Sequence, residues 1–346
     1  MSFKRFDPED FVVSSDAITA TAWSGNAPRL TTFHTSSVQE GGVSGKYYLN
    51  VYQTSSTDPA AEVQFNIAYG NSAGSGSELY NTGILGYSPT STVYGQFQNL
   101  VLGDENTNFS FDGVEKTDFY AITVDRQRFK EKILPGTFNI SVTGSAFEST
   151  IQLTDNSKDT NILTFNEAGR VFQIVSGSNG RAIALDSSAA NNVGKGTTES
   201  GSYGLFLPDI GTFLLNASAL DLPKSKGGVN LGTVKTSNTD GRNNPRLFTA
   251  VSGGFDFQIN SEETITSDFA FIRARNAEFN YSENPSFISG SQGTVIYDLF
   301  INNPQTYITT VGLYNDANEL LAVAKLSKPL KKDFTKEALV RVKLDF

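Results

Sequence analysis

The 346-residue sequence predicts an all-β fold of two or three antiparallel, sandwich-like domains with long loops and few short helices. Three observations predict this fold. Short segments rich in Val, Ile, Thr, Phe and Tyr recur between clusters of Gly, Asn, Asp, Ser and Pro. Helical spacing of apolar residues is scarce. The chain is also longer than one hydrophobic core usually serves, which indicates more than one domain.

The expected domains follow one another along the chain. An N-terminal arm with the first strands (1–58) precedes a β-domain (59–176), a loop-rich β region that could be an insertion (177–250) and a C-terminal β-sandwich (251–346).

In the first half, strands are expected at 47–52, 62–69, 138–142 and 149–153. In the second of these, every other residue from Val63 to Tyr69 is apolar, while Glu62, Gln64 and Asn66 alternate with them. Because successive strand residues face opposite sides, this pattern predicts a half-buried antiparallel strand.

Helices are expected only at 93–102, 125–132 and 335–339, where apolar residues recur at helical spacing over short stretches. A run of Ser, Gly, Asn and Ala at 176–203 predicts a long surface loop, either a partner-contacting segment or a plain loop. A second loop is expected at 223–245.

The C-terminal third predicts consecutive strands, as in a sandwich. They lie at 254–259, 269–274, 277–281, 294–302, 306–315, 320–326 and 337–346. Asn and Asp residues at 314–319 predict a hairpin turn, because they tolerate the left-handed backbone of tight turns.

The charge balance disfavours a nucleic-acid partner. The chain has 27 Lys and Arg against 36 Asp and Glu, a formal charge of −9, and its densest basic stretches, 126–132 and 325–332, are short and interrupted. A membrane partner is not expected either, because no run of about eighteen apolar residues occurs and the first residues are polar and charged. We therefore expect a protein that is made and kept soluble.

The residue inventory predicts no enzyme, no cofactor and no metal. The chain has no cysteine, which excludes disulfides, thiolate metal sites and a cysteine nucleophile. His34 is the one histidine, so a zinc site with two histidines cannot form, and no nucleophile elbow supports a catalytic triad. The glycine-rich stretches 41–46 and 74–79 lack the spacing of phosphate-binding loops.

Two pairs of adjacent carboxylates, Glu262 with Glu263 and Asp104 with Glu105, leave a glycan hydrolase open as an alternative, since such enzymes use two carboxyl groups. Residues 155–159 look partly like a calcium loop. They lack its glycine and its final Glu, which Asn166 replaces, so no metal site is expected.

Several segments together resemble virion structural proteins of T-even-like myoviruses, particularly those of marine cyanophages. The strongest is YITTVGLYND (307–316) with LAVAKLSKP (321–329). The others are YGNSAGSGS (69–77), YGQF (94–97) with LGDEN (102–106), FKEKILPG (129–136), YGLFLPDIG (203–211) and EFNYSENP (278–285).

The resemblance implies a structural subunit of a contractile bacteriophage tail, with the baseplate wedge as the expected place. The protein would assemble in the host cytoplasm, reside in the virion, and bind other tail or baseplate proteins as a homo-oligomer in a symmetric assembly. No active-site residue comes with the resemblance.

Two further hypotheses about binding rest on aromatic residues that are expected to be exposed. A receptor- or glycan-binding attachment or fibre-adaptor protein is the alternative, with Trp23 and Tyr203 as its binding candidates. In the N-terminal arm, Phe3, Phe6 and Phe11 lie amid charged residues, so they either contact a partner or pack within the chain.

Overall fold

The computed structural model describes residues 4–36, 48–76, 89–144, 149–183, 197–198, 200–236, 240–282 and 284–345. The predicted all-β class is confirmed: strands make up 43% and helices 18%, and the sheets are antiparallel. The chain forms two compact units. We call Met1–Ala17 with Thr264–Phe346 the terminal unit, and Ile18–Glu263 the central unit.

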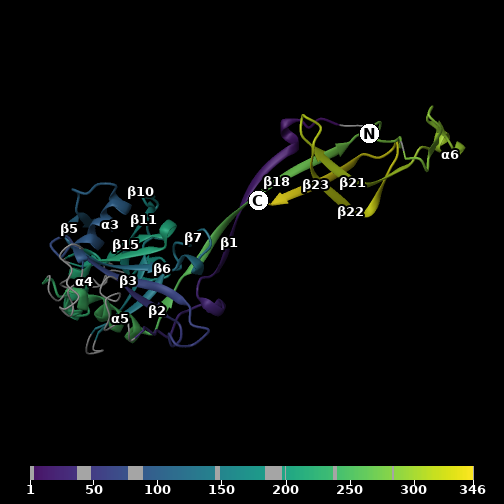
Figure 1. Cartoon of the computed structure of the whole chain (residues 1–346). Helices are drawn as coiled ribbons and strands as arrows, with labels where there is room; N and C mark the ends of the chain where they lie inside the picture. The colour runs from purple at the N-terminus through teal and green to yellow at the C-terminus, as the bar shows by residue number, and fades with distance from the viewer. Residues whose placement is uncertain are drawn as a thin grey trace. The chain divides into compact units, whose positions relative to one another are not determined.

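The central unit is built on one eleven-stranded sheet, in the order β17-β8-β9-β11-β15-β16-β6-β3-β2, with β10 and β12 paired to parts of β11 (Figure 1). Its strands are β2 (Leu49–Tyr52), β3 (Val63–Asn71), β6 (Asp118–Val124), β8 (Asn139–Thr143), β9 (Thr150–Asp155), β10 (Thr164–Asn166), β11 (Gly169–Ser178), β12 (Arg181–Ala182), β15 (Gly204–Leu207), β16 (Thr212–Leu215) and β17 (Phe257–Gln258).

Smaller elements surround this sheet. The helices are α3 (Thr90–Leu102), α4 (Ala217–Asp221) and α5 (Asn243–Gly254). The short strands are β4 (Phe109–Phe111), β5 (Val114–Lys116), β7 (Lys132–Ile133), β13 (Thr197–Thr198) and β14 (Gly201–Ser202). Single 3-10 turns lie at Ser24–Asn26, Arg126–Arg128, Pro208–Ile210, Lys224–Lys226 and Asp240–Arg242.

Both faces of the large sheet are buried. In β6, Tyr120 and Ile122 belong to one hydrophobic cluster, while Phe119 and Ala121 belong to another. Because strand residues alternate between faces, the two clusters lie on opposite sides of the sheet. Helix α3 contributes to the second cluster and α5 to the first, and Figure 1 shows these helices on opposite sides.

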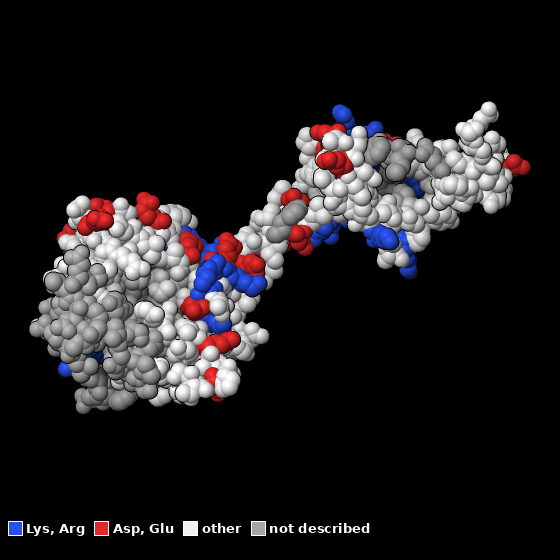
Figure 2. Space-filling model, in the orientation of Figure 1, with Lys and Arg blue, Asp and Glu red and all other residues white. Residues whose placement is uncertain are grey.

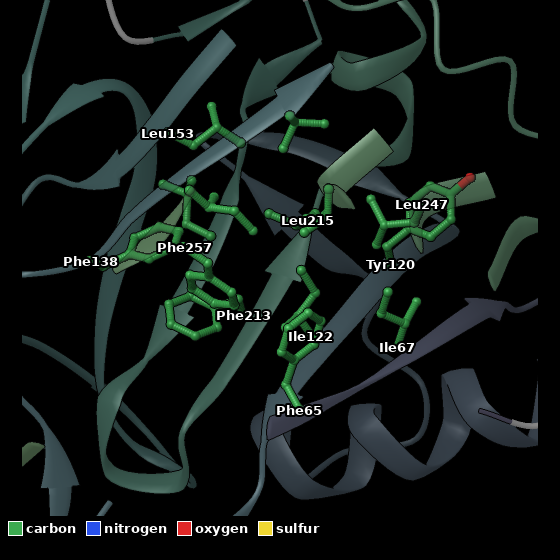
Figure 3. Packing of buried hydrophobic residues seen from close by; sticks show 14 of the residues in the cluster. Phe65, Ile67, Tyr120, Ile122, Phe138, Leu153, Phe213, Leu215, Leu247 and Phe257 are labelled. Carbon is green, nitrogen blue, oxygen red and sulfur yellow. The ribbon is translucent and has the colours of Figure 1, made fainter. Parts of the chain in front are cut away.

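Aromatic rings pack against one another and against aliphatic side chains in the larger cluster (Figure 3). The ring of Phe213 stacks on Phe206 with centroids 4.7 Å apart, and it lies 4.3 Å from Phe138. Phe257 packs edge-on to Phe65 at 5.3 Å. Ring pairs in such geometries add to the free energy gained by burial, so the central unit has a dense core of its own.

The terminal unit contains a small sheet and a separate hairpin. Strands β1 (Phe11–Thr21), β18 (Asn260–Ala274) and β23 (Ala338–Asp345) are neighbours in that order, and β21 (Thr306–Tyr314) with β22 (Leu320–Lys332) forms a separate hairpin. The chain passes from one unit to the other within β1 and within β18. The remaining elements are a 3-10 turn (Pro8–Asp10), β19 (Ile288–Ser289), β20 (Thr294–Val295) and α6 (Asp298–Asn302).

Most expected elements of the sheets are confirmed. The first-half strands correspond to β2, β3, β8 and β9, the helix at 93–102 to α3, and the last three expected strands to β21, β22 and β23. The hairpin turn is also present, with Asn318 in the left-handed region at φ 62°. The expectation for β3 was wrong on one point, because its second face is covered: Gln64 is buried and Ala68 packs against the second cluster.

Other expected elements were wrong, for local reasons. At 125–132 the Asp125 side chain accepts a hydrogen bond from Gln127 N and caps a single 3-10 turn. At 335–339 the chain enters β23, where Ala338 pairs with Ala274. The expected strand at 277–281 is interrupted by Phe279, whose φ is 56°.

Two further boundaries differ from expectation. The loop expected at 223–245 gives way to α5 at Asn243, and α5 continues into the strand expected at 254–259. The strand expected at 294–302 becomes β20 followed by α6. No helix among the described residues is long and apolar enough to cross a membrane.

Candidate functional site

The two carboxylate pairs serve local structure. Asp104 accepts hydrogen bonds from Thr107 Oγ1 at 2.5 Å and Asn106 N at 2.9 Å, and these bonds lower the pKa of its carboxyl group. Glu105 accepts a hydrogen bond from Asn99 Nδ2. Such a turn holds its carboxylate ionised, the opposite of what a general acid needs.

Glu262 and Glu263 are adjacent on β18, so their side chains point to opposite faces. Glu263 forms an ion pair with Lys130 at 3.5 Å. In the parts of the chain that the structure describes, no three His, Cys, Asp or Glu side chains gather as they would around a metal ion. The structure therefore brings neither expected pair into a two-carboxylate site.

The other polar candidates are also structural where they are described. His34 is exposed and exchanges backbone hydrogen bonds with Tyr52. Asp155 is buried and accepts hydrogen bonds from the backbone N–H groups of Gly136 and Ser157, which fixes a turn. The stretch 41–46 lies outside the described residues, as do residues 77–79 of the stretch 74–79.

The two aromatic candidates for glycan binding were wrong, because both are core residues. Trp23 is 2% exposed and donates a hydrogen bond from Nε1 to Phe257 O at 2.7 Å. Tyr203 is also 2% exposed, and its hydroxyl donates to Gly227 O at 2.8 Å. Burial raises the pKa of Tyr203 to about 12. A sugar could reach neither ring, so the attachment alternative loses the residues that suggested it.

The loop expected at 176–203 is only partly described. Its first residues complete β11 and form β12, and Thr197–Thr198 pairs with Gly201–Ser202. The stretch 184–196 and residue 199 lie outside the described residues.

The structure reveals a buried polar junction that the sequence did not indicate. Asp118 is 2% exposed; it accepts hydrogen bonds from the Tyr69 hydroxyl at 3.2 Å and from Lys235 Nζ at 2.9 Å. Burial, with the nearby Asp118 charge, raises the pKa of Tyr69. Nearby in the same unit, Thr90 Oγ1 donates to Asp240 at 2.5 Å. Long-range contacts of this kind leave no spacing signal in the sequence.

The most unusual surface belongs to the terminal unit. Among its described residues, the only buried hydrophobic side chains are those of Ala270, Ala274, Ala338 and Val342. The two hydrophobic clusters that the described residues form both lie in the central unit. Large side chains that a domain normally buries are instead exposed, among them Val13, Leu299, Ile301, Tyr307, Leu321 and Leu339.

A cleft opens on this unit between the sheet and the β21–β22 hairpin. It encloses about 1240 Å³. One wall comes from the N-terminal arm and β18, through residues such as Phe6, Phe11 and Phe271, and the facing wall comes from β21. Phe6 and Phe11 pack edge to face at 4.8 Å, and Phe11 remains 48% exposed. The arm therefore packs on itself and also lines the cleft, while Phe3 lies outside the described residues.

The hairpin carries basic charge on its exposed surface. Lys325, Lys328 and Lys331 are exposed, whereas Lys332 is buried. Of the other basic stretch, Arg128 is tied to Glu62 at 2.7 Å and Arg126 stacks on the Phe129 ring at 4.7 Å. The exposed apolar side chains of the terminal unit and its cleft together form the candidate functional surface.

Comparison of the chain with protein-family models, with curated proteins and with solved structures gave no match.

Proposed function

We propose that this protein is a structural subunit of a contractile bacteriophage tail, most simply a baseplate wedge component, that acts through protein–protein interfaces. One observation carries the proposal: the terminal unit exposes large hydrophobic side chains and buries only three alanines and one valine among its described hydrophobic residues. A domain without its own core is not stable alone, because burial of apolar surface is the main force that opposes chain entropy.

Partner proteins would bury the hydrophobic side chains that the terminal unit leaves exposed. A surface rich in exposed apolar side chains is typical of an interaction site, and obligate interfaces resemble a domain core cut in half. The contrast within the chain supports this interpretation. The central unit covers both faces of its sheet with its own helices and loops, so one unit is self-sufficient and the other needs a neighbour.

The sequence resemblance supports the kind of assembly. Its strongest segment, 307–316 with 321–329, covers most of β21, the start of the turn and most of β22, the hairpin with the exposed Tyr307 and Leu321. The segment that most resembles tail proteins is therefore part of the exposed apolar surface of the terminal unit.

The proposal is tested on particles of the virus that encodes the chain. Antibodies against the purified protein should label intact particles at symmetric positions at the distal end of the tail. A protein found in lysates of infected cells but absent from purified particles would contradict the proposal.

A further inference from the structure

We infer that the apolar tip of the terminal unit, residues 288–303, docks into the cleft of the same unit on a second copy of the chain. The inference rests on the proposed function, since it specifies one of the interfaces through which the subunit would assemble.

The cleft suits a protein segment better than a small molecule. Its volume of about 1240 Å³ exceeds the range of roughly 300–1,000 Å³ that is typical of small-molecule pockets. Its walls combine aromatic rings, among them Phe271, Phe279 and Tyr307, with strand backbone. An apolar segment inserted between the two walls would bury the hydrophobic side chains that line them.

The tip has the matching chemistry. The ring of Phe287 at its base packs against Phe300 at 5.4 Å and against Tyr297 at 6.5 Å, which gives it a small aromatic anchor. Leu299 is nevertheless 82% exposed and Ile301 67% exposed. Figure 1 shows α6 at one end of this unit, and Figure 2 shows little charge around that end. Exposed apolar side chains that are grouped on one short segment are typical of an interaction site.

The tip does not fill the cleft of its own copy. Residues 288–305, all described, contribute nothing to its walls, although Phe287 does. Each copy therefore has one unpaired apolar tip and one unfilled cleft. Two complementary surfaces on one chain generate a head-to-tail contact, which forms a ring where the rotation closes and an open filament where it does not.

Charge complementarity supports the same pairing. Asp298 is the one charged residue between Asn284 and Asn303. The cleft wall carries Lys4, Arg5 and Arg273 against Asp10 and Asp316, a small positive excess. Within the described residues neither arginine forms an ion pair. Because interfaces orient partners through opposite charges, an arginine on the wall can receive the carboxylate of the tip. In the terminal unit, Lys and Arg nearly balance Asp and Glu, so most of the formal charge of −9 lies in the central unit. Repulsion between two copies is therefore weak where their terminal units meet.

Introduced cysteines test the contact directly, because the full chain contains none. Leu299→Cys in the tip and Thr310→Cys in the cleft are made in separate chains, one with a size tag, and are mixed under mild oxidation. We expect a mixed disulfide, which forms only when the two backbones approach within about 7 Å. In the matched control, Ile162→Cys replaces Thr310→Cys; Ile162 is 76% exposed in the central unit and should give at least ten-fold less mixed product. Equal yields with both partners, or mainly tip-to-tip disulfide, would overturn the inference.

Light scattering and sedimentation measure the assembly itself. The wild-type chain should associate with increasing concentration, and the double variant Leu299→Glu/Ile301→Glu should weaken association at least ten-fold. Ile162→Glu, with unchanged association, controls for the loss of an exposed apolar side chain. If the wild type stays monomeric at all concentrations, self-docking is wrong, while binding to other tail proteins under the proposed function still stands. Flotation with phosphatidylcholine and phosphatidylglycerol vesicles that depends on Leu299, without the mixed disulfide, would assign the tip to membranes and also overturn self-docking.

Discussion

At the residue scale, Asp240 shows how a buried carboxyl group makes stability depend on pH. Its side chain is fully buried and accepts a hydrogen bond from Thr90, and burial raises its pKa to about 6. Between about pH 4 and pH 6 the folded protein keeps this proton while the unfolded chain loses it. The contribution of Asp240 to stability is therefore fully present below pH 4 and is lost as the pH rises through 6.

We expect Asp240→Asn to be more stable than the wild type at pH 8, by about 2 kcal/mol, because the amide has no charge to desolvate. The difference should shrink as the pH falls toward 4. Urea unfolding of both proteins from pH 4 to pH 8 measures it. Glu115→Gln, on an exposed residue of β5, is the control for removal of one carboxylate. A gap between Asp240→Asn and the wild type that is constant with pH would contradict the assignment.

Lys332 is a buried ammonium group held by oxygen atoms. Its Nζ donates to Asn276 O at 2.9 Å, Asn280 Oδ1 at 3.0 Å and Asp333 O at 3.0 Å. Lys332→Met keeps the length of the side chain but leaves Asn280 Oδ1, the buried acceptor, unpaired, which costs about 1–3 kcal/mol. Asn276 O and Asp333 O keep their hydrogen bonds from Asn280 Nδ2 and Lys336 N. Hydrogen exchange should therefore show loss of protection around residues 276–280.

The neighbouring Lys331→Met is the control, because Lys331 is exposed. Equal loss of protection in both variants would show that the charge of the strand matters and that the three hydrogen bonds of Lys332 do not.

At the element scale, α3 approaches the sheet closely at Gly70. A Cβ on Gly70 would lie 3.0 Å from Phe119 Cζ and 3.1 Å from the Cα of Tyr94 in α3. Gly70→Ala should lower the free energy of unfolding by about 1–3 kcal/mol, because the helix must move away from β3. Gly95→Ala, on α3 itself with no atom near its added Cβ, should raise it by about 0.5–1 kcal/mol. Chemical denaturation of both variants should give opposite signs; destabilisation of similar size in both would refute the close approach.

The elements also show how far the sequence could predict the fold. Strands with clear alternation, such as β3 and β23, and the helix α3 were predictable because local periodicity coincides with burial. Helix α5 was not predicted: Pro245 and the closing glycines indicate a loop, although Leu247, Ala250 and Val251 have helical spacing and contact the core. Tertiary packing decided between these two local signals.

The candidate surface was harder to predict. Trp23 and Tyr203 were expected to be exposed aromatic residues, yet long-range contacts with Phe257 and Gly227 bury both. The reverse holds for β21 and β22, whose apolar residues predict a core strand although many of them are exposed. Alternation predicts which face of a strand is apolar, but it cannot show whether the same chain covers that face.

At the scale of the whole molecule, the two units should differ in how they depend on assembly. Strands β6 and β16 are buried on both faces, so their amides should exchange slowly at any protein concentration. Amides of β21 and β22 should exchange faster in dilute solution and should gain protection as concentration rises. Hydrogen exchange with mass spectrometry at two concentrations measures this, and an equal gain in β6 and β22 would contradict a specific interface on the terminal unit.

The order of the units along the chain has a consequence during synthesis. The central unit, Ile18–Glu263, lies between the two segments that build the terminal unit. A ribosome therefore releases the whole central unit before Thr264–Phe346 emerges, and domains generally fold as units during translation. The terminal unit, with its exposed apolar side chains, is thus completed after the central unit has emerged, which shortens the time in which nascent chains could associate through those side chains.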